Sequence, residues 1–507
     1  FFAAAIELGT HDRARLRGLQ IELATALMHA GRGPEAALAF LAAADGAEPA
    51  VRLDCQRQAA DQWIITGHLE QGMATLRSLL ADIGEPLAAT PRRALARVVW
   101  NRARVRMRGF GHTTRRESQV PVETLRRLDV LKAVAHGLAM VDNIRGADFN
   151  GRYLRLALRT GEPRRLLGAL ATEVIFLGSQ GGRAATRARR LYAELVRLAE
   201  DCPDAAFART WLELADGGAS FFEGRFTRAV VALEAAEIAS AHGQAGMTYE
   251  RNNAVVFRIH ALRLLGRLLH QHALIRESVR TGRQRGDRYL ETTLRLLQGP
   301  SLLARDDRHG ARNSLDEASW TPPDQGFHLQ HWYELRARTE LALYERTASA
   351  AVLALAPRFV ALDRSMLLRV QIVRADACAL RGRLLLGAIA EQAAPDPRAQ
   401  DVERIARQLA GEKTGYAAVY ALLLRAGLAV IDAGRGDPIP LLREAIELAT
   451  THDMALHVAA ARDRLGALVG GDEGAALRAA AAGYAATEGI VDPDRMFEVL
   501  APGIARR

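Results

Sequence analysis

Apolar and small side chains recur every three to four residues along most of the chain, which places them on one face of an α-helix. The pattern is clearest between residues 23 and 49, where a glycine at position 31 separates two such faces. The inner faces of the two predicted helices are formed by Leu23, Ala24 and Leu27, then by Ala36, Phe40 and Ala43. Small residues let the helix backbones approach, and large ones fill the gaps. The segment therefore predicts a tetratricopeptide-like helical hairpin.

The same arrangement returns after about 36 residues, close to the tetratricopeptide period of ~34, with equivalent places occupied by Ala59, Ala60, Ile64, Gly67, Gly72, Leu76 and Leu79. Later copies are looser, with predicted turns at Gly224, near Gly266, around Gly434, and at Gly470 and Gly471. No periodic segment alternates apolar and polar residues as a strand would. The chain is therefore predicted to be an all-α, tetratricopeptide-like α-solenoid: a right-handed superhelix of about a dozen hairpins, or two dozen helices, with a concave side.

Proline-containing stretches interrupt the periodicity at 109–123, 320–328 and 391–400, where helices are expected to stop. None of the three has the length or the glycine and serine content of a flexible linker. We therefore expect one continuous solenoid with three segments: N-terminal repeats (1–108), central repeats (109–325) and C-terminal repeats (326–507).

The composition supports helices packed through small side chains, because aromatic residues are only 6% of the 507 residues. The net charge is +10, yet Lys132 and Lys413 are the only lysines and every other basic residue of that count is arginine. Arginine clusters at 183–200 and 280–288 are interleaved with acidic residues and leucines. We interpret them as solvated helix faces rather than a surface for nucleic acid, so no nucleic-acid partner is expected.

The cysteines and the lengths of the apolar runs indicate the compartment. Cys55, Cys202 and Cys378 are far apart and form no metal-binding spacing, which suits a reducing cytoplasm. No apolar run approaches the ~18–20 residues of a membrane helix, and no signal sequence is evident. We expect a cytoplasmic protein that makes no membrane contact. Because it starts with FFAAAIELG, without methionine and as if inside a helix, we expect it to be part of a larger protein.

The sequence lacks the motifs of nucleotide binding and of common catalytic sites. Neither lysine follows a glycine, so no Gly-Lys-Ser/Thr loop can hold phosphates. The His-Arg-Asp and Asp-Phe-Gly motifs of kinases and the Gly-x-Ser-x-Gly elbow of hydrolases are also absent. The pairs His270/His272 and His328/His331 have no further ligand at a metal-binding spacing. We therefore expect no catalytic, cofactor-binding or metal-binding residues, and assign Trp332 and Tyr333 to helix packing.

Residues 141–163 combine Asp148-Phe149-Asn150 with three arginines at helical spacing, which makes a phosphate site an alternative to consider. We favour a structural interpretation, in which one helix ends near Ile144, Gly146 permits a turn, and Asp148 caps the next helix. The arginines along one flank of that next helix would be Arg152, Arg155 and Arg159.

Six stretches carry a likeness to a known family: WNRARVRMRGF, VPVETLRRLDVLKAVAHGLAMVDNIRGADF, GFHLQHWYELRARTELALYE, SMLLRVQIVRADACALRGR, RDRLGALVGGDEGAALRAA and DPDRMFEVLAPG. Over nearly its whole length the chain resembles the C-terminal helical-repeat region of large bacterial serine/threonine protein kinases. Those proteins also carry an N-terminal kinase domain and a middle AAA-type ATPase module. The resemblance implies that ATP and magnesium bind in those upstream domains, because their motif residues have no matching positions here.

The same resemblance implies a non-catalytic regulatory module that binds a protein or peptide, including the parent's own kinase and ATPase domains. An alternative is the sensor or scaffold tail of an ATPase-type transcription activator, although MFEVLAPGIARR at the end is too short for a helix-turn-helix. An enzyme in its own right would need a convergent set of titrating groups, which the sequence does not show.

Partner contacts can be predicted from the register of the first two hairpins, because in tetratricopeptide arrays the first helix of each hairpin lines the groove. By register, Thr25 and Met28 of the first hairpin face the concave side, as do Arg57 and Asp61 of the second. We predict these four residues as groove contacts. The alternative is that Arg57 and Asp61 merely pair with each other at positions i and i+4.

Overall fold

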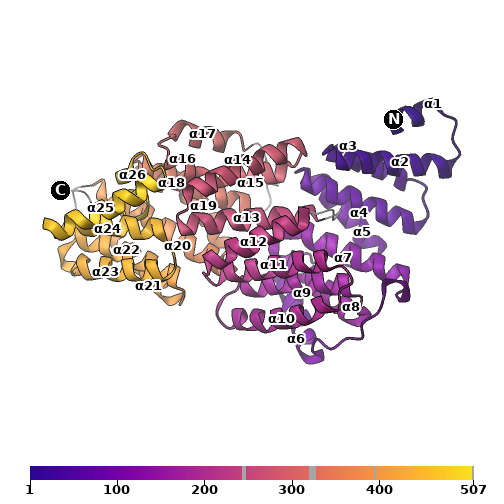
Figure 1. The fold of residues 1–507 in the computed structure, drawn as a ribbon, viewed down its shortest axis with the longest axis horizontal. Helices are drawn as coiled ribbons and strands as arrows, with labels where there is room; N and C mark the ends of the chain where they lie inside the picture. The colour runs from indigo at the N-terminus through magenta and orange to yellow at the C-terminus, as the bar shows by residue number, and fades with distance from the viewer. Residues whose placement is uncertain (242–246, 319–326, 393–395, 505–507) are drawn as a thin grey trace.

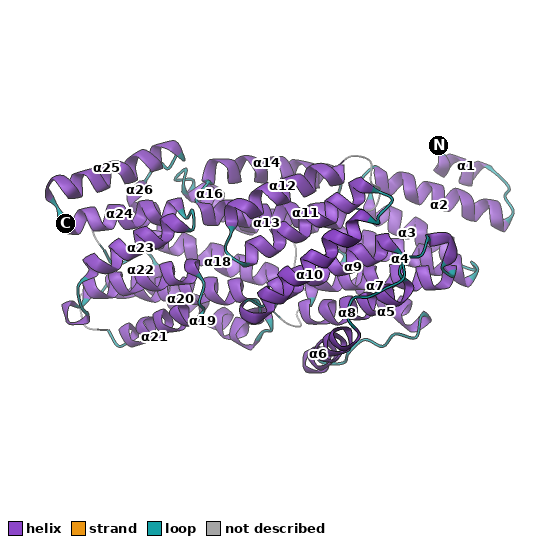
Figure 2. Ribbon diagram, turned by 60° about the horizontal axis from the view of Figure 1, so that its bottom comes forward, coloured by secondary structure: helices purple, strands orange, loops and turns teal. Residues whose placement is uncertain are grey.

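The computed structural model describes residues 1–241, 247–318, 327–392 and 396–504. Within these ranges it contains 26 α-helices, three short 3₁₀ helices and no strand. The predicted all-α class is confirmed, and helices adjacent in sequence pack on one another as in an α-solenoid. Figures 1 and 2 show an elongated array with the two termini at opposite ends.

The helices follow one another along the chain with short connections. The N-terminal ones are α1 (Phe2–Leu8), α2 (Arg13–His29), α3 (Gly33–Ala44), α4 (Pro49–Ile65), α5 (Leu69–Asp82), α6 (Pro91–Arg108), η1 (Glu117–Gln119), α7 (Val122–Val141) and α8 (Asn143–Thr160). The central ones are α9 (Pro163–Gly178), α10 (Gly182–Glu200), α11 (Ala205–Phe222), α12 (Phe226–Ala241), α13 (Thr248–Leu265), α14 (Leu268–Gln284), α15 (Arg288–Leu297), α16 (Gly299–Leu303) and α17 (Arg308–Asp316). The C-terminal ones are α18 (Leu329–Tyr344), α19 (Ala348–Arg364), η2 (Leu367–Arg369), α20 (Gln371–Ala390), α21 (Arg398–Gly411), α22 (Gly415–Ile431), η3 (Ala433–Arg435), α23 (Pro438–Thr451), α24 (Ala455–Val469), α25 (Gly471–Thr487) and α26 (Pro493–Leu500).

The predicted hairpin turns fall at boundaries between α-helices, with Gly434 inside the short η3 and Gly471 as the first residue of α25. They separate α2 from α3, α4 from α5, α11 from α12, α13 from α14, α22 from α23, and α24 from α25. Gly224 shows the physical reason, since its φ of 81° lies in the left-handed region that only glycine enters without strain. Glycine position and the change of apolar face therefore predicted these turns correctly.

The first helices of successive hairpins pack side by side and form an inner layer, which consists of α4, α7, α9, α11, α13, α15, α18, α20 and α22. Second helices such as α10 and α14 bury one face against this layer and expose the other. The main apolar core extends from Ala60 to Ile504, so it crosses both expected segment boundaries. A separate small cluster around Phe40 and Trp63 joins α2, α3 and α4.

Segments that are far apart in the chain also contact one another. The Tyr484 hydroxyl on α25 donates a 2.5 Å hydrogen bond to the carbonyl oxygen of Gly266, 218 residues earlier. Thr227 on α12 donates a 2.7 Å hydrogen bond to Asp453, which lies 226 residues away. Towards the N-terminus, a Cβ atom on Gly31 would lie only 2.4 Å from the Cα atom of Arg285. The array is therefore held together by long-range contacts as well as by packing of neighbouring hairpins.

The predicted cap of the helix within 141–163 is wrong. Helix α8 starts at Asn143, and Asp142, not Asp148, caps it. The Asp142 carboxylate accepts hydrogen bonds from the backbone N–H groups of Ile144 and Arg145 at 3.2 and 3.0 Å. Asp142, which precedes the expected cap Asp148 in the chain, satisfies the free N–H groups in the same way, so the helix begins earlier than its apolar pattern suggested.

Asp148 and Gly146 instead lie inside α8, where both serve helix packing. Asp148 is fully buried, accepts a 3.1 Å hydrogen bond from Asn101 of α6 and pairs with Arg152 at 2.5 Å. Gly146 faces α7, where an added Cβ atom would lie 2.9 Å from the backbone nitrogen of Ala139. Glycine therefore allows close contact between two helices here and makes no turn.

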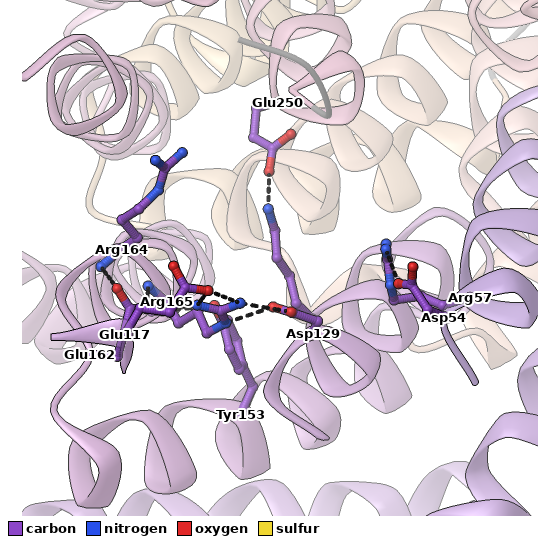
Figure 3. A network of polar contacts seen from close by, with 10 residues as sticks. Asp54, Arg57, Glu117, Asp129, Tyr153, Glu162, Arg164, Arg165 and Glu250 are labelled. Atoms are coloured by element: carbon purple, nitrogen blue, oxygen red, sulfur yellow. Dashed lines mark hydrogen bonds and ion pairs between the residues drawn. The ribbon is translucent and has the colours of Figure 1, made fainter. Parts of the chain in front are cut away.

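The predicted break at 109–123 is a loop that contains η1 and leads into α7. Arg165 on α9 forms an ion pair with this loop, in the network drawn in Figure 3. The Arg165 guanidinium pairs with Glu117 of η1 at 3.4 Å, Asp129 of α7 at 2.8 Å and Glu162 at 3.1 Å. One arginine thus ties the loop to two neighbouring hairpins.

The other two predicted breaks fall partly or mostly outside the described residues, which exclude 319–326 and 393–395. Around the second of these gaps, α20 ends at Ala390 and α21 starts at Arg398. Helical structure is therefore interrupted on both sides of that gap, as its prolines predicted.

Candidate binding cavity

A cavity of about 570 Å³ lies in the central part of the coil. Its wall comes mainly from the inner-layer helices α9, α11, α13, α15, α18 and α20, with α6 and α8 contributing as well. Aromatic side chains form much of the wall: Phe176, Trp211, Phe221, Phe222, Tyr249, Phe257, Tyr289, Trp332 and Tyr333. A volume in this range and a largely apolar wall with a few polar groups are typical of small-molecule sites.

The charged residues of the wall are strongly biased towards arginine. Five arginines and one acidic residue line the cavity: Arg102, Arg263, Arg336, Arg369, Arg374 and Asp376. Arg102 is neutralised by Glu173 at 2.6 Å, and Arg374 by Glu412 at 2.6 Å. Of the remaining three arginines, Arg263 and Arg336 contact the Asp376 carboxylate and Arg369 is exposed, so arginines outnumber acidic groups on the wall.

Two of those arginines and the aspartate form a buried cluster that joins three helices. Arg263 on α13 donates to Asp376 on α20 at 2.8 Å, and the Nη1 atom of Arg336 on α18 lies 3.6 Å from the same carboxylate oxygen. All three side chains are nearly inaccessible to solvent. Among the described residues, no hydrogen-bond partner is present for Nε and Nη2 of Arg336, Nε of Arg263 or Oδ1 of Asp376.

Burial and neighbouring charges shift the pKa values of this cluster. Burial disfavours the charged form of Asp376, but the nearby arginines outweigh it and hold the pKa of Asp376 below its ordinary value. Burial and repulsion from Arg263 lower the pKa of Arg336. Burial, together with Arg383 and Arg263, lowers the pKa of His457 to about 3, so this neighbouring histidine is neutral at physiological pH. The cluster therefore keeps excess positive charge in a poorly solvated place.

A second buried ion pair lies beside the aromatic part of the wall. Lys132 on α7 pairs with Glu250 on α13 at 3.0 Å, and its ammonium lies 5.4 Å from the ring centroid of Trp211. The His136 ring stacks on Tyr249 with the centroids 4.3 Å apart. Burial lowers the pKa of His136 to about 3, with Glu250 opposing and Lys132 reinforcing this shift. This end of the cavity is therefore charge-balanced, unlike the end near Arg336.

Of the predicted groove residues, Arg57 and Asp61 lie on the side of α4 towards the interior. Arg57 pairs with Asp54 at 2.7 Å and with Asp61 at 3.3 Å, so the predicted i,i+4 pair does form. Figure 3 shows Arg57 and Asp54 at a distance from Glu250, beyond Asp129. Burial raises the pKa of Asp61 to about 6, while Arg57 and Lys132 act in the opposite direction. Neither residue lines the cavity.

Thr25 and Met28 lie on α2 and do not line the cavity either. The Thr25 hydroxyl donates a 2.8 Å hydrogen bond to the carbonyl oxygen of Ile21 within α2. Met28 is partly buried against the small N-terminal apolar cluster. The four predicted contacts therefore form no common surface around the cavity.

Of the three arginines along the flank of α8, only Arg152 forms ion pairs with carboxylates among the described residues. Arg152, Arg155 and Arg159 line a smaller hollow of about 350 Å³ together with Glu85. Arg152 contacts Glu85 at 3.1 Å, and Arg155 donates a 2.8 Å hydrogen bond to the side-chain oxygen of Asn101. Arg152 therefore serves helix packing, whereas Arg155 and Arg159 form no ion pair within the described residues.

The sequence analysis did not identify Arg263, Arg336 or Asp376. The available signal was weak: each is a charged residue at a position where neighbouring turns of the helix are apolar, as Arg336 is within HWYELRARTELALY. Trp332 and Tyr333, assigned to packing, are indeed buried, and they also line the cavity. Across the described ranges, no group of three or more histidine, cysteine, aspartate or glutamate side chains is arranged to hold a metal ion.

Comparison with known proteins does not identify a family. No family model matches the sequence, and no curated protein matches it significantly. Among the described residues, no helix is both long enough and apolar enough to cross a membrane.

Proposed function

We propose that this chain is a non-catalytic regulatory module of helical repeats, belonging to a bacterial multidomain serine/threonine protein kinase with an AAA-type ATPase module. The resemblance of the six sequence stretches supports the parent. In this proposal the module is cytoplasmic and contacts a protein or peptide, including the parent's own kinase and ATPase domains, and neither nucleic acid nor membrane. ATP and magnesium belong to the upstream domains.

A binding role is supported by the cavity lined by helices of the array. Its wall is shared by helices from α6 to α20, and segments far apart in the chain contact each other directly. A ligand that binds one arrangement of these helices more tightly than another shifts the population of the chain towards the arrangement it prefers. Such a shift changes the relative positions of protein segments bound at the ends or on the outer surface of the module. In this way a repeat module can transmit ligand binding to a kinase domain.

The same cavity fits a second proposal, the sensor tail of an ATPase-type transcription activator. An enclosed, mostly apolar site suits detection of a small molecule in either parent. The two parents differ in the neighbouring reading frame, because a kinase requires His-Arg-Asp and Asp-Phe-Gly motifs there and an activator requires a DNA-binding domain.

Capture of the upstream segment tests the proposed function. The segment encoded before Phe1 in the same reading frame would be produced separately and mixed with the purified chain. We expect a complex on size-exclusion chromatography and a changed rate of autophosphorylation of the segment. The proposed function would be overturned if the upstream segment lacked kinase motifs. It would also be overturned if adding the chain changed neither the autophosphorylation rate nor the elution volume of the segment.

A further inference from the structure

The smaller hollow, where α6 packs against α8, contains more arginine than its acidic groups can neutralise (Figure 2). Its charged lining consists of five arginines and two carboxylates: Arg97, Arg127, Arg152, Arg155, Arg159, Glu85 and Asp148. Glu85 already pairs with Arg127 and Arg152. Asp148 pairs with Arg152 as well. Three arginines of the hollow therefore have no carboxylate partner among the described residues.

The free N–H groups of these arginines are open to solvent. Arg97 donates a 3.0 Å hydrogen bond to the carbonyl oxygen of Pro86, and Arg155 donates one bond to Asn101. The other nitrogens of the Arg155 side chain are not buried. Arg159 is exposed, and its side chain has no acceptor within the described ranges. Arg155 and Arg159 can therefore donate to a ligand that enters the hollow.

The surroundings add further positive charge. Burial lowers the pKa of Arg155, and repulsion from Arg104 and Arg159 adds to the shift, with Glu85 opposing it. The Arg104 guanidinium carbon lies 5.5 Å from the ring centroid of Trp100, which also lines the hollow. Helix α6 has seven arginines and no acidic residue among its 18 residues. An anion with more than one negative charge suits this place.

A phosphate ester matches the hollow better than a carboxylate does. At neutral pH it carries a charge of about −1.5 to −2 and offers three strong acceptor oxygens. Two guanidinium groups can each donate to such a group through their planar forks. One carboxylate brings a single charge, which would leave most of the surplus at Arg97, Arg155 and Arg159 without a counter-charge.

The apolar surface beside the hollow indicates what the phosphate is attached to. Trp100 is 58% exposed, and Met107, about 10 Å further along the same face of α6, is 76% exposed. A free phosphate ion would leave both uncovered, whereas apolar residues next to a phosphorylated one would cover them. A nucleic-acid strand needs a row of phosphate contacts. Here the arginines converge on one hollow, and its carboxylates Glu85 and Asp148 would repel further phosphates.

We propose that this hollow binds a phosphoserine or phosphothreonine of a polypeptide segment, with the phosphate on Arg155 and Arg159 and flanking apolar side chains on Trp100. The proposal rests on the proposed function, because a serine/threonine kinase parent produces such residues. It adds the chemistry of the partner that the module binds. Asp148 and Arg152 hold the helices together in this account, and the other two arginines of the α8 flank receive the ligand.

Probes that differ in one group test the ligand chemistry. The phosphorylated probe is a heptapeptide with leucine on both sides of a central phosphoserine, and it would be titrated into the chain by calorimetry. The unphosphorylated peptide, inorganic phosphate, adenosine 5′-monophosphate and a single-stranded DNA decamer would be compared with it. We expect one phosphopeptide per chain, with the unphosphorylated peptide at least about tenfold weaker because it lacks the charge-assisted bonds. Inorganic phosphate should also bind more weakly, because it does not reach Trp100.

Three results would overturn the proposal. The first is no saturable binding of the phosphopeptide, and the second is equal affinity for the phosphorylated and unphosphorylated peptides. The third is tighter binding of adenosine 5′-monophosphate or of the DNA decamer, which would assign the hollow to nucleotides or nucleic acid.

Variants on α6 and α8 test the contacts. Arg159→Met should weaken phosphopeptide binding about tenfold. Arg106→Met is the matched control, since Arg106 is exposed on α6 and lies outside the hollow, and its loss changes the net charge equally. Trp100→Ala should weaken the phosphopeptide severalfold and leave inorganic phosphate unchanged. Equal losses in Arg159→Met and Arg106→Met would show general attraction to a basic surface and overturn the assignment to the hollow.

Failure of this proposal can be distinguished from failure of the proposed function. If the phosphopeptide does not bind, yet the chain captures the upstream segment equally before and after phosphatase treatment, only the phosphate site is wrong. If the phosphopeptide binds and adding the chain affects neither the elution nor the autophosphorylation of the upstream segment, the site stands and the kinase role is wrong.

Discussion

The Arg263 guanidinium on α13 donates a 2.8 Å hydrogen bond to the Asp376 carboxylate on α20, 113 residues further along the chain. Both side chains are buried, and Arg336 shares the same carboxylate. This contact holds two inner-layer helices together at the electropositive end of the cavity.

Asp376→Asn should therefore destabilise the chain strongly. Removing one partner of a buried pair leaves uncompensated charge, and such losses reach about 3–5 kcal/mol in the free energy of unfolding. Chemical denaturation monitored by circular dichroism measures the change. The matched control is Asp363→Asn, which breaks a 2.9 Å pair with Arg381 whose carboxylate is about half exposed and should cost less than about 1 kcal/mol. Similar losses in both variants would contradict the role given to the buried cluster.

The contact between successive turns of the coil predicts different costs for two glycine substitutions. Gly31 and Gly84 both have positive φ, 76° and 65°, so replacing either by alanine costs about 1–2 kcal/mol of backbone strain. A Cβ atom on Gly84 meets no atom within 4 Å, whereas on Gly31 it would lie 2.4 Å from the Cα atom of Arg285. Gly31→Ala should therefore lose more stability than Gly84→Ala.

Hydrogen exchange locates that extra loss. Only Gly31→Ala should accelerate amide exchange around residues 284–287, because only there must the two turns separate. If both variants lose the same stability and exchange near Arg285 is unchanged, the turns do not touch in solution.

Acid should destabilise the chain through its buried histidines. Burial, with Arg383 and Arg263, lowers the pKa of His457 to about 3, and the unfolded value is about 6.5. Above pH ~6.5 both states hold a neutral imidazole. Below it only the unfolded state takes up the proton, so stability falls by about 1.4 kcal/mol per pH unit for this group until the folded pKa is reached. His136 acts in the same direction, whereas burial raises the pKa of Asp61 to about 6, which opposes the loss between its unfolded and folded values.

His457→Gln should remove part of this slope. Free energies of unfolding at about pH 7 and about pH 5 should differ less in the variant than in the wild-type chain, by up to about 2 kcal/mol for one histidine. His29→Gln, on the exposed last turn of α2, is the control and should leave the slope unchanged. An unaltered slope in His457→Gln would show that this imidazole is already charged or solvated in the folded state.

Arg57 and Asp61 give a prediction for the partner surface. If they contact the upstream segment, Arg57→Glu and Asp61→Arg should each weaken its capture while the melting temperature stays nearly constant. Arg52→Glu serves as the control, because Arg52 lies on the same helix and makes only a loose 3.7 Å pair with Asp82. Unaltered capture by both test variants would rule out a contact at these positions and leave the i,i+4 pair as their role.

The hairpins could be predicted from the sequence because their causes are local. Gly31 and Gly224 mark turns through backbone conformation, and the spacing of alanines and leucines identifies the buried faces. The error at Asp148 arose from the same local reasoning. Both Asp142 and Asp148 could cap a helix, and only the packing of Gly146 against α7 decides between a turn and a continuous helix.

The cavity could not be predicted in this way. Its closure depends on small rotations between hairpins that accumulate until Tyr484 meets Gly266 and Gly31 meets Arg285. Arg336 and Asp376 then come together from α18 and α20, although nothing in their local sequence indicates a shared site. The candidate site therefore depends on long-range packing, whereas the helical hairpins can be predicted from the local sequence pattern.

The regulatory role is tested most directly by measuring the kinase activity of the parent protein after a larger side chain has been placed in the cavity. Val256 on α13 lines the cavity, and Val231 on α12 is 56% exposed on the outer layer. Autophosphorylation would be measured in the full-length protein carrying Val256→Trp or Val231→Trp, after confirming that both melt near the wild-type temperature. We predict that Val256→Trp changes the rate severalfold and that Val231→Trp leaves it unchanged. Equal rates in the wild-type protein and both variants would contradict a regulatory role for the interior of this coil.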